Sequence, residues 1–267
     1  MSEELEGLID KRLDEFRTFA EAITREAGEL VAERFRRGSF EVEDKEDGSP
    51  VTEADRDAEL LLRKRIESRF PEHGVIGEEF GGTDVSRDFV WVLDPIDGTK
   101  SFIHGVPLFG TLVGLLHENR SVIGCIFQPV LDQMAVGDNR TTFLNGEPTR
   151  VREARAISDS TLLLTDPSDP VFLDRGEVFK SLIREAGIVR SWGDCFGYLS
   201  LVSGKADAML DPVLSPWDLL PLLPVLRGAG AIVSDFRGLN AEEGNSLIAS
   251  SSREFHDRIL ECFAGGH

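Results

Sequence analysis

The chain has 267 residues, of which 41% are apolar and 29% are charged, as in soluble globular proteins large enough to bury a core. Its net charge of −19 repels nucleic acid and anionic membranes and attracts metal cations, so we expect neither nucleic acid nor a membrane as a partner. The chain contains no apolar run of the roughly 18 residues that a membrane helix needs, and its acidic N-terminus and three scattered cysteines indicate a cytoplasmic protein with reduced thiols.

Two amphipathic helices are predicted near the N-terminus. Apolar residues recur at helical spacing from residue 5 to 35, which predicts one long helix. In the polar segment that follows, Phe40 and Val42 alternate with polar residues and favour a short strand or a hairpin arm. A second helix is expected from residue 52 to about residue 70. Its inward-facing residues should be Leu60, Leu61, Ile66 and Phe70.

Short apolar runs predict the strands of the first half. Val75–Ile76 and Phe89–Leu93 are typical of buried strands, and each run ends in acidic residues. Between residues 108 and 128, two apolar strands flank a turn at residues 117–121, and residues 133–137 can add a third strand. These three strands would form an antiparallel meander.

The second half of the chain alternates strands with helices. Strands are expected at residues 162–165, 188–191, 208–210, 232–234 and 247–249. Helices are expected at residues 171–186, 197–203, 216–227 and 252–263. This order predicts an α+β protein with layered structure in two subdomains, residues 1–147 and 148–267.

The stretch WVLDPIDGTKSF at residues 91–102 carries the first chemical signal. Its apolar run stops at Asp94, and a second carboxylate follows at Asp97. Two carboxylates about 4 Å apart near a protein surface repel each other by roughly 4 kcal/mol. Such a pair persists if the two groups share a proton, point apart or bind a cation.

The residues around the two aspartates fit a site for a cation and an anion. Pro95 favours an extended backbone at Asp94, and Gly98 permits a sharp turn. Thr99 could then cap a helix whose exposed N–H groups point at an anion. Carboxylates beside such a helix end can bind a divalent metal together with phosphate. The alternative is a strand-to-helix loop with incidental capping acids.

Further acidic residues occupy similar places, although each also has a structural explanation. Glu78 and Glu79 follow a short predicted strand. Asp218 begins a predicted helix and could be only a first-turn acid that the helix dipole favours. Asp55 could form a capping box with Thr52.

Together these segments resemble the inositol monophosphatase superfamily of metal-dependent, lithium-sensitive phosphatases. The matching segments follow the family order and are Lys45–Asp55, Gly77–Glu79, Asp94–Thr99, Trp217–Asp218 and Gly228–Gly230. The resemblance implies the family's layered αβαβα sandwich of the sugar phosphatase type, assembled as a homodimer.

Within the superfamily, the chain looks like the branch of bacterial and plant histidinol-phosphate phosphatases. The segments that carry this narrower resemblance are Lys100–Ile103, Gly105–Leu112, Gly193–Tyr198 and Ser234–Gly238. The chain departs from the branch at Trp217, where tyrosine is more common, and at Pro221, where alanine is more common. Both departures bear on the substrate and leave the acidic residues intact.

The resemblance implies a metal site made of oxygen ligands, which suits Mg²⁺ or alternatively Mn²⁺ and argues against zinc. One metal would bind Glu78, Asp94 and the carbonyl oxygen of Ile96. A second would bind Asp94, Asp97 and Asp218, so that Asp94 would bridge the two metals. A weaker third metal could bind at Glu78.

The resemblance also assigns catalytic and phosphate-binding roles. Water activated by the metals would attack phosphorus, with Glu78 among the catalytic residues. Thr99, hydrogen-bonded to Asp55, would orient or deprotonate that water. Asp97 and the N–H groups of Gly98 and Thr99 would bind the phosphate.

The body of the substrate is expected to contact Asp194 and Asp211. Asp211 matches an acidic position that contacts the non-phosphate part of the substrate in relatives. With Asp194 it could bind an ammonium group, each charge-assisted hydrogen bond contributing about 1.5–3 kcal/mol. Cys195 lacks an activating histidine and is interpreted as packing or as a pocket wall.

The leading hypothesis is therefore a Mg²⁺-dependent phosphomonoesterase that hydrolyses L-histidinol phosphate, which carries an ammonium group. Within the same class, the alternative is a phosphatase for an inositol monophosphate or a sugar (bis)phosphate. From a different class, the alternative is a non-catalytic metal-binding scaffold. Thr99 and Asp55 argue against a scaffold, because a scaffold has no use for a pair that activates water.

Overall fold

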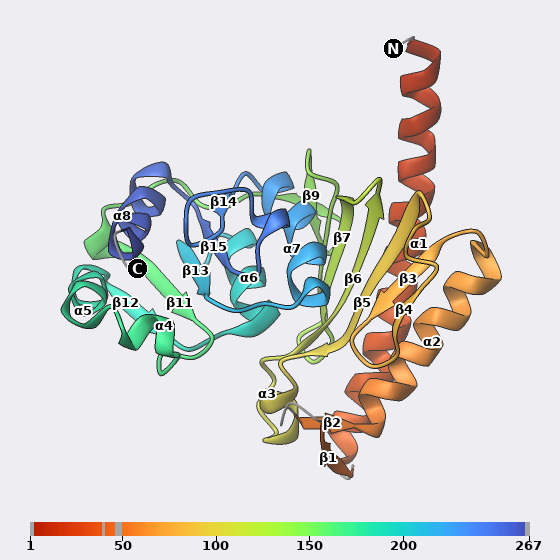
Figure 1. The fold of residues 1–267 in the computed structure, drawn as a ribbon, viewed down its shortest axis with the longest axis horizontal. Helices are drawn as coiled ribbons and strands as arrows, with labels where there is room; N and C mark the ends of the chain where they lie inside the picture. The colour runs from red at the N-terminus through yellow and green to blue at the C-terminus, as the bar shows by residue number, and fades with distance from the viewer. Residues whose placement is uncertain (1–2, 39–40, 46–49, 265–267) are drawn as a thin grey trace.

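The structure is a computed structural model that describes residues 3–38, 41–45 and 50–264. Its helices and sheets alternate in layers, in the order of an αβαβα sandwich (Figure 1). The predicted layered α+β fold is therefore confirmed. The helices are α1 (Glu3–Arg37), α2 (Glu53–Arg69), α3 (Thr99–Ile103), α4 (Pro170–Leu173), α5 (Gly176–Glu185), α6 (Asp194–Val202), α7 (Pro216–Gly228) and α8 (Arg253–Phe263). Short 3₁₀ turns lie at Ile157–Asp159 and Ala241–Glu243.

The two N-terminal helices form as the sequence predicts and cover the outer face of the larger sheet. α1 buries Phe16 and Ile23 in the core that it shares with α2 and this sheet. α2 begins after Thr52, where the predicted capping box is present: Asp55 accepts the N–H of Thr52 at 2.8 Å. Within the described ranges, none of the helices is both long enough and apolar enough to cross a membrane.

The inward face of α2 differs in part from the prediction. Leu60 is 52% exposed, and Leu62 is fully buried instead. Leu62 and Ile66 stand one helical turn apart and share the face that packs on the larger sheet. The prediction for Leu60 is therefore wrong, whereas Ile66 and Phe70 are buried as predicted.

The larger sheet contains the predicted meander. Its strand order is β10-β9-β8-β7-β6-β5-β3-β4. These strands are β3 (Gly74–Gly77), β4 (Gly81–Thr83), β5 (Phe89–Asp97), β6 (Gly110–His117), β7 (Arg120–Gln128), β8 (Gln133–Gly137), β9 (Thr142–Leu144) and β10 (Glu147–Thr149). The sequence did not predict β4 (Gly-Gly-Thr), β9 (Thr-Phe-Leu) or β10 (Glu-Pro-Thr), because none of them stands out as an apolar run or as an alternating segment.

Strand β5 is longer than the apolar run that predicts it. It continues through Asp94 and Pro95 to Asp97, so the expected end at Asp94 is wrong. Its pairing with β6 is irregular between Asp94 and Asp97, and the Thr111 hydroxyl of β6 donates to the Pro95 carbonyl at 2.8 Å. β3 runs parallel to β5, so Glu78 and the two aspartates emerge at the same edge of the sheet.

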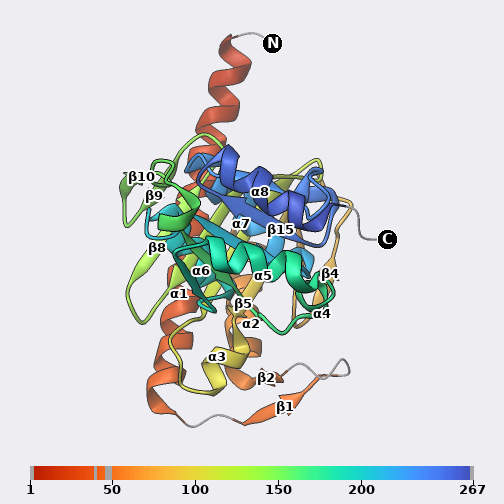
Figure 2. The same cartoon turned by 90° about the vertical axis from the view of Figure 1, so that its left-hand side faces the viewer.

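A hairpin arm lies near this edge. β1 (Val42–Asp44) and β2 (Pro50–Thr52) pair antiparallel, so of the two alternatives predicted for this segment the structure shows the hairpin arm. The arm and α3 lie at the same end of the molecule in both views (Figures 1 and 2). Phe40 and residues 46–49 of the predicted upstream match lie outside the described residues.

The smaller sheet and its helices follow the predicted order, with strands arranged β12-β11-β13-β15-β14. Its strands are β11 (Thr161–Leu164), β12 (Ile188–Arg190), β13 (Ala208–Asp211), β14 (Ile232–Ser234) and β15 (Leu247–Ser250). The single helix expected at residues 171–186 is divided into α4 and α5, because Gly176, the first residue of α5, takes a positive φ of 52°. α6 starts at Asp194, earlier than predicted.

Helix α7 lies between the two sheets and packs closely on the larger one. A Cβ atom at Gly124 of β7 would lie only 1.9 Å from the Pro221 carbonyl oxygen, so only glycine permits this contact. Pro224 has no N–H for the Leu220 carbonyl, and the Ser121 hydroxyl donates to that carbonyl instead. Because α7 joins the halves in one core, the division at residue 147 stays a prediction.

Candidate metal and phosphate site

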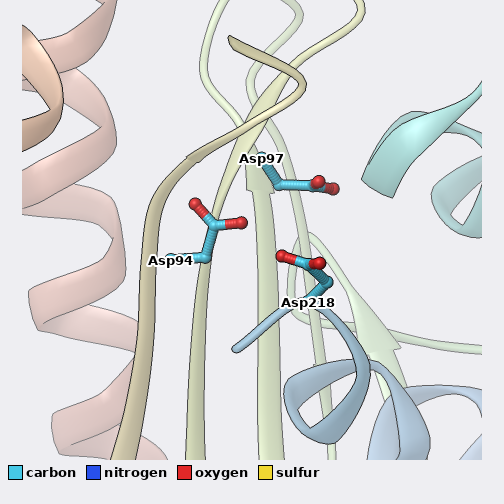
Figure 3. Close-up of side chains that lie close together, drawn as sticks. All are labelled: Asp94, Asp97 and Asp218. Atoms are coloured by element: carbon cyan, nitrogen blue, oxygen red, sulfur yellow. The ribbon is translucent and has the colours of Figure 1, made fainter. Parts of the chain in front are cut away.

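Asp94, Asp97 and Asp218 converge at the edge of the larger sheet (Figure 3). One oxygen from each carboxylate lies within 4.8 Å of the others, and this is the group of possible metal ligands found among the described residues. Two of the aspartates come from β5 and the third from the first turn of α7. One oxygen of Asp218 accepts the N–H of Ser215 at 2.8 Å. Asp218 therefore caps α7 and belongs to the acidic cluster at the same time.

The electrostatics of these aspartates fit a divalent cation. Burial raises the pKa of Asp94 well above its usual value, and the charges of Glu78, Asp97 and Asp218 raise it further. Burial and the charge of Asp194 raise the pKa of Asp97 in the same way, and burial raises that of Asp218. Crowded acids of this kind keep protons unless a cation compensates their charge, and oxygen ligands suit Mg²⁺ or Mn²⁺.

Glu78 lies beside this cluster and pairs with Lys45 of the hairpin arm. The Lys45 ammonium donates to Glu78 and to Glu79, each at 2.7 Å. The Glu78 backbone N–H donates to the Leu93 carbonyl of β5 at 3.2 Å, which fixes it next to Asp94. Burial raises the pKa of Glu78, and Asp218 also raises it, so Glu78 belongs to the same electrostatic cluster.

The turn after β5 requires glycine for two reasons. Gly98 has a φ of 90°, and its Cβ atom would lie 2.7 Å from the Leu108 carbonyl oxygen. Gly98 is also the N-cap residue of α3 and Thr99 is its first residue, so the expectation that Thr99 caps the helix is wrong. The reason is that the left-handed backbone, which ends the strand, falls on the glycine.

Thr99 and Asp55 are not hydrogen-bonded to each other in this structure. The Thr99 hydroxyl donates to the Ile96 carbonyl at 2.9 Å, which uses its one proton. Asp55 accepts from the Thr52 N–H and hydroxyl through Oδ2, and its buried Oδ1 has no partner among the described residues. Burial raises the pKa of Asp55 to about 6. Asp55 therefore keeps one acceptor oxygen unused.

Asp194 and Asp211 lie at different depths. Asp194 has a φ of 50° at the start of α6, and its N–H donates to the Thr165 hydroxyl at 2.9 Å. A Cβ atom at Gly98 would lie 3.1 Å from an oxygen of Asp194, so Asp194 borders the turn. Asp211 is only 3% exposed and accepts the Tyr198 hydroxyl at 2.7 Å. Asp194 is only partly buried, so it is the more accessible of the two.

Sequence reasoning missed two contributions to the site. The Cys195 N–H donates to the Asp97 carboxylate, so the backbone at the start of α6 holds a member of the cluster. No sequence pattern signals this contact. Glu59 of α2 is fully buried and accepts backbone N–H groups from the turn after Glu78. The sequence feature that could have indicated this role is a glutamate placed one helical turn before Arg63, on the apolar face between Ala58 and Leu62.

The buried acids make a testable contribution to the pH dependence of stability. Burial raises the pKa of Asp211 to about 8 from a usual value of 3.8. Its proton stays bound in the folded protein at pH values where the unfolded chain has lost it, so this contribution is lost as pH rises from about 4 to about 8. In EDTA, wild type should lose stability relative to Asp211→Asn over this range. Denaturant titrations at each pH check this, and a constant difference would contradict it.

Comparisons with known proteins identify the family of this chain. The model of the inositol monophosphatase family matches residues 12–265. The chain is 37% identical to a histidinol-phosphatase of Chlorobaculum parvum, over 86% of this chain and 90% of the relative. It is 40% identical to a chloroplastic bifunctional phosphatase of Arabidopsis thaliana, over 95% of this chain and 76% of the relative.

Solved structures agree with the sequence comparisons. An inositol monophosphatase from Zymomonas mobilis superposes with a TM-score of 0.80 at 33% identity, covering 94% of this chain and 98% of that one. The family match spans nearly the whole chain, and the layers and the acidic cluster are of the kind that the sequence predicts. The chain therefore belongs to the inositol monophosphatase family, and it is a phosphoric monoester hydrolase.

Proposed function

We propose that the protein is a Mg²⁺-dependent phosphomonoesterase that hydrolyses L-histidinol phosphate to L-histidinol and phosphate. The proposal rests chiefly on the convergence of Asp94, Asp97 and Asp218 beside the start of α3. The histidinol-phosphatase of Chlorobaculum parvum supports this choice of substrate. From the family resemblance we also propose that the enzyme acts in the cytoplasm as a homodimer.

The chain offers a complete set of oxygen donors for the metal. Asp94, Asp97, Asp218, Glu78 and the Ile96 carbonyl would hold Mg²⁺, or alternatively Mn²⁺. The bound cation would supply a Lewis acid that neutralises phosphate charge and lowers the pKa of water. Glu78 would exchange its contact with the Lys45 ammonium for this role. Lys45 would keep Glu79 as its partner.

The residues around the turn would bind phosphate and move a proton. The N–H groups of Gly98 and Thr99 would donate to the phosphate as negative charge builds on it. The Thr99 hydroxyl would turn from the Ile96 carbonyl towards the unused oxygen of Asp55. A carboxylate with a pKa of about 6 is suited to accept a proton near neutral pH.

The acidic residues of the second half would select a cationic substrate. Asp194 borders the phosphate-binding turn and would accept the ammonium group. Asp211 would line the site behind it, and its pKa of about 8 keeps it protonated near neutral pH. An inositol monophosphate or a sugar (bis)phosphate is the alternative, which the identity to the Zymomonas mobilis enzyme favours. A non-catalytic metal-binding scaffold is a distant alternative, because a scaffold would not need a pair of residues that activates water.

Asp194→Asn should reduce selectivity for the cationic substrate. The change keeps the size of the side chain and removes its charge, so kcat/KM for histidinol phosphate should fall about thirtyfold relative to inositol 1-phosphate, equivalent to about 2 kcal/mol. Steady-state kinetics on both substrates measure this ratio. The control is Asp174→Asn, an exposed aspartate of the same half, which should leave the ratio unchanged. An unchanged ratio in Asp194→Asn would contradict the proposed contact.

The metal requirement has a direct test. Phosphate release from histidinol phosphate should disappear after treatment with EDTA and dialysis, and it should return on addition of Mg²⁺. Zn²⁺ should restore much less activity, because the donors are all oxygen atoms. Full activity after exhaustive chelation would contradict the proposed function.

A further inference from the structure

One buried carboxylate outside the aspartate cluster is tied to a segment that carries a proposed metal ligand. Glu59 of α2 is 0% exposed and lies one helical turn after Asp55. It accepts the backbone N–H groups of Glu79 and Phe80 at 2.7 and 3.2 Å. It also accepts from the Arg63 side chain at 2.7 Å. Glu59 thus binds the backbone directly after Glu78.

Arg63 extends this anchor by one residue. Its guanidinium donates both to Glu59 and to the backbone carbonyl of Gly81. Together the two side chains of α2 bind the backbone of residues 79–81, and the Glu78 N–H is bound on the other side by the Leu93 carbonyl of β5. The backbone on both sides of Glu78 is therefore fixed.

The residue before Glu78 is Gly77, and the absence of a side chain there leaves room for the Glu59 carboxylate. A Cβ atom at Gly77 would lie 2.1 Å from one oxygen of Glu59, far inside any normal contact. Any side chain at this position would displace the carboxylate from the turn. The glycine and the buried acid thus depend on each other, which a purely apolar contact would not require.

Burying a carboxylate between a helix and a sheet is unfavourable for stability. Its neighbours on this face, Ala58 and Leu62, are apolar and fully buried. Burying a charge costs free energy that only good hydrogen bonds offset. An apolar residue of similar size at such a position often gives a protein that is equally stable. The carboxylate contributes directional hydrogen bonds, because its oxygens hold backbone N–H groups at defined positions.

We propose that Glu59, braced by Arg63, is a positioning residue for Glu78. It sets the backbone of the turn so that the Glu78 carboxylate faces the three aspartates. The inference rests on the proposed metal site, and it concerns residues outside the acidic motifs. Glu59 acts through the backbone of residues 79 and 80 and makes none of the contacts proposed for the metal.

The test is metal binding by Glu59→Gln, measured apart from activity. The amide keeps the size of the side chain. However, its NH₂ group cannot accept a hydrogen bond, whereas in wild type both carboxylate oxygens of Glu59 accept from N–H donors. Calorimetric titration with Mn²⁺, at a temperature where circular dichroism shows a folded protein, should give a dissociation constant about tenfold higher than wild type. Glu67→Gln is the matched control, because Glu67 is an exposed glutamate on the same helix. It should bind Mn²⁺ as wild type does.

Kinetics add a second readout. The Mg²⁺ concentration for half-maximal activity should rise about tenfold in Glu59→Gln, while kcat at saturating Mg²⁺ stays close to wild type. If Glu59→Gln does not fold, Gly77→Ala tests the same contact, because the new methyl group displaces the carboxylate. It should weaken Mn²⁺ binding similarly.

A lowered Tm with an unchanged Mn²⁺ dissociation constant, in either variant, would show that Glu59 only supports the fold and would overturn the inference. Wild type itself tests the proposed metal site. If wild type does not bind Mn²⁺, the proposed metal site and this inference both fail. If wild type binds and the variants bind equally well, only the inference fails.

Discussion

Asp94→Asn should nearly abolish activity, with kcat/KM falling roughly 10⁴-fold, because several kcal/mol of charge stabilisation would be lost. Asp94 is 1% exposed and has the most crowded position in the acidic cluster. By the family resemblance it would contact both principal metals, so one substitution weakens two sites. Steady-state kinetics across a range of Mg²⁺ concentrations measure the loss. Near wild-type activity would contradict the bridging role.

The stability of this variant should move in the opposite direction to its activity. In EDTA, Asp94→Asn should have a Tm at least equal to wild type, because the neutral amide replaces a buried acid that must either hold a proton or repel the neighbouring carboxylates. Mg²⁺ should raise the Tm of wild type but not of the variant, because a ligand stabilises only the state that binds it. Asp88→Asn is the control, since Asp88 is exposed just before β5. It should respond to Mg²⁺ as wild type does.

Thr99→Ala should lower kcat by about 10²–10⁴-fold with little loss of stability, because it removes a hydroxyl proposed to orient the attacking water. The helix cap is Gly98, so the substitution does not remove a capping side chain. It removes one hydrogen bond, to the Ile96 carbonyl, for a cost of about 1 kcal/mol. Single-turnover kinetics and thermal denaturation separate the two effects.

Thr99→Ser provides the matched control for this variant. Serine keeps the hydroxyl and removes only a methyl group, so it should retain most of the activity of wild type. If Thr99→Ala is destabilised but fully active, the hydroxyl only braces the turn at Ile96. That result would remove Thr99 and Asp55 from the proposed mechanism.

The sequence predicts the two aspartates of β5 well because their signal is local. Asp94, Asp97 and Gly98 lie in one short stretch, and the end of an apolar run indicates where a carboxylate reaches the edge of a sheet. Glu78 follows another short apolar run, and in the structure the strand of that run, β3, lies parallel to β5. Residue spacing therefore places these acids at strand ends, whereas their assignment to one metal site together with Asp218 comes from the family resemblance.

The supporting contacts could not be predicted because they join segments far apart in sequence. Glu59 binds a backbone N–H twenty residues away in the sequence, and the Cys195 N–H binds Asp97 from a sequence separation of 98 residues. These contacts depend on how α2 and α6 pack, which local patterns do not describe. The course of β5 has a similar cause, because pairing with β6 continues past Pro95 and overrides the local preference for an end at Asp94.

The substrate is the central claim, and one ratio tests it most directly. The specificity constant kcat/KM should be measured for histidinol phosphate, inositol 1-phosphate and fructose 1,6-bisphosphate at saturating Mg²⁺. An acidic residue beside the turn proposed to bind phosphate predicts a clear preference for the cationic substrate, by at least about tenfold. A preference for either of the other two substrates would contradict the histidinol phosphate assignment.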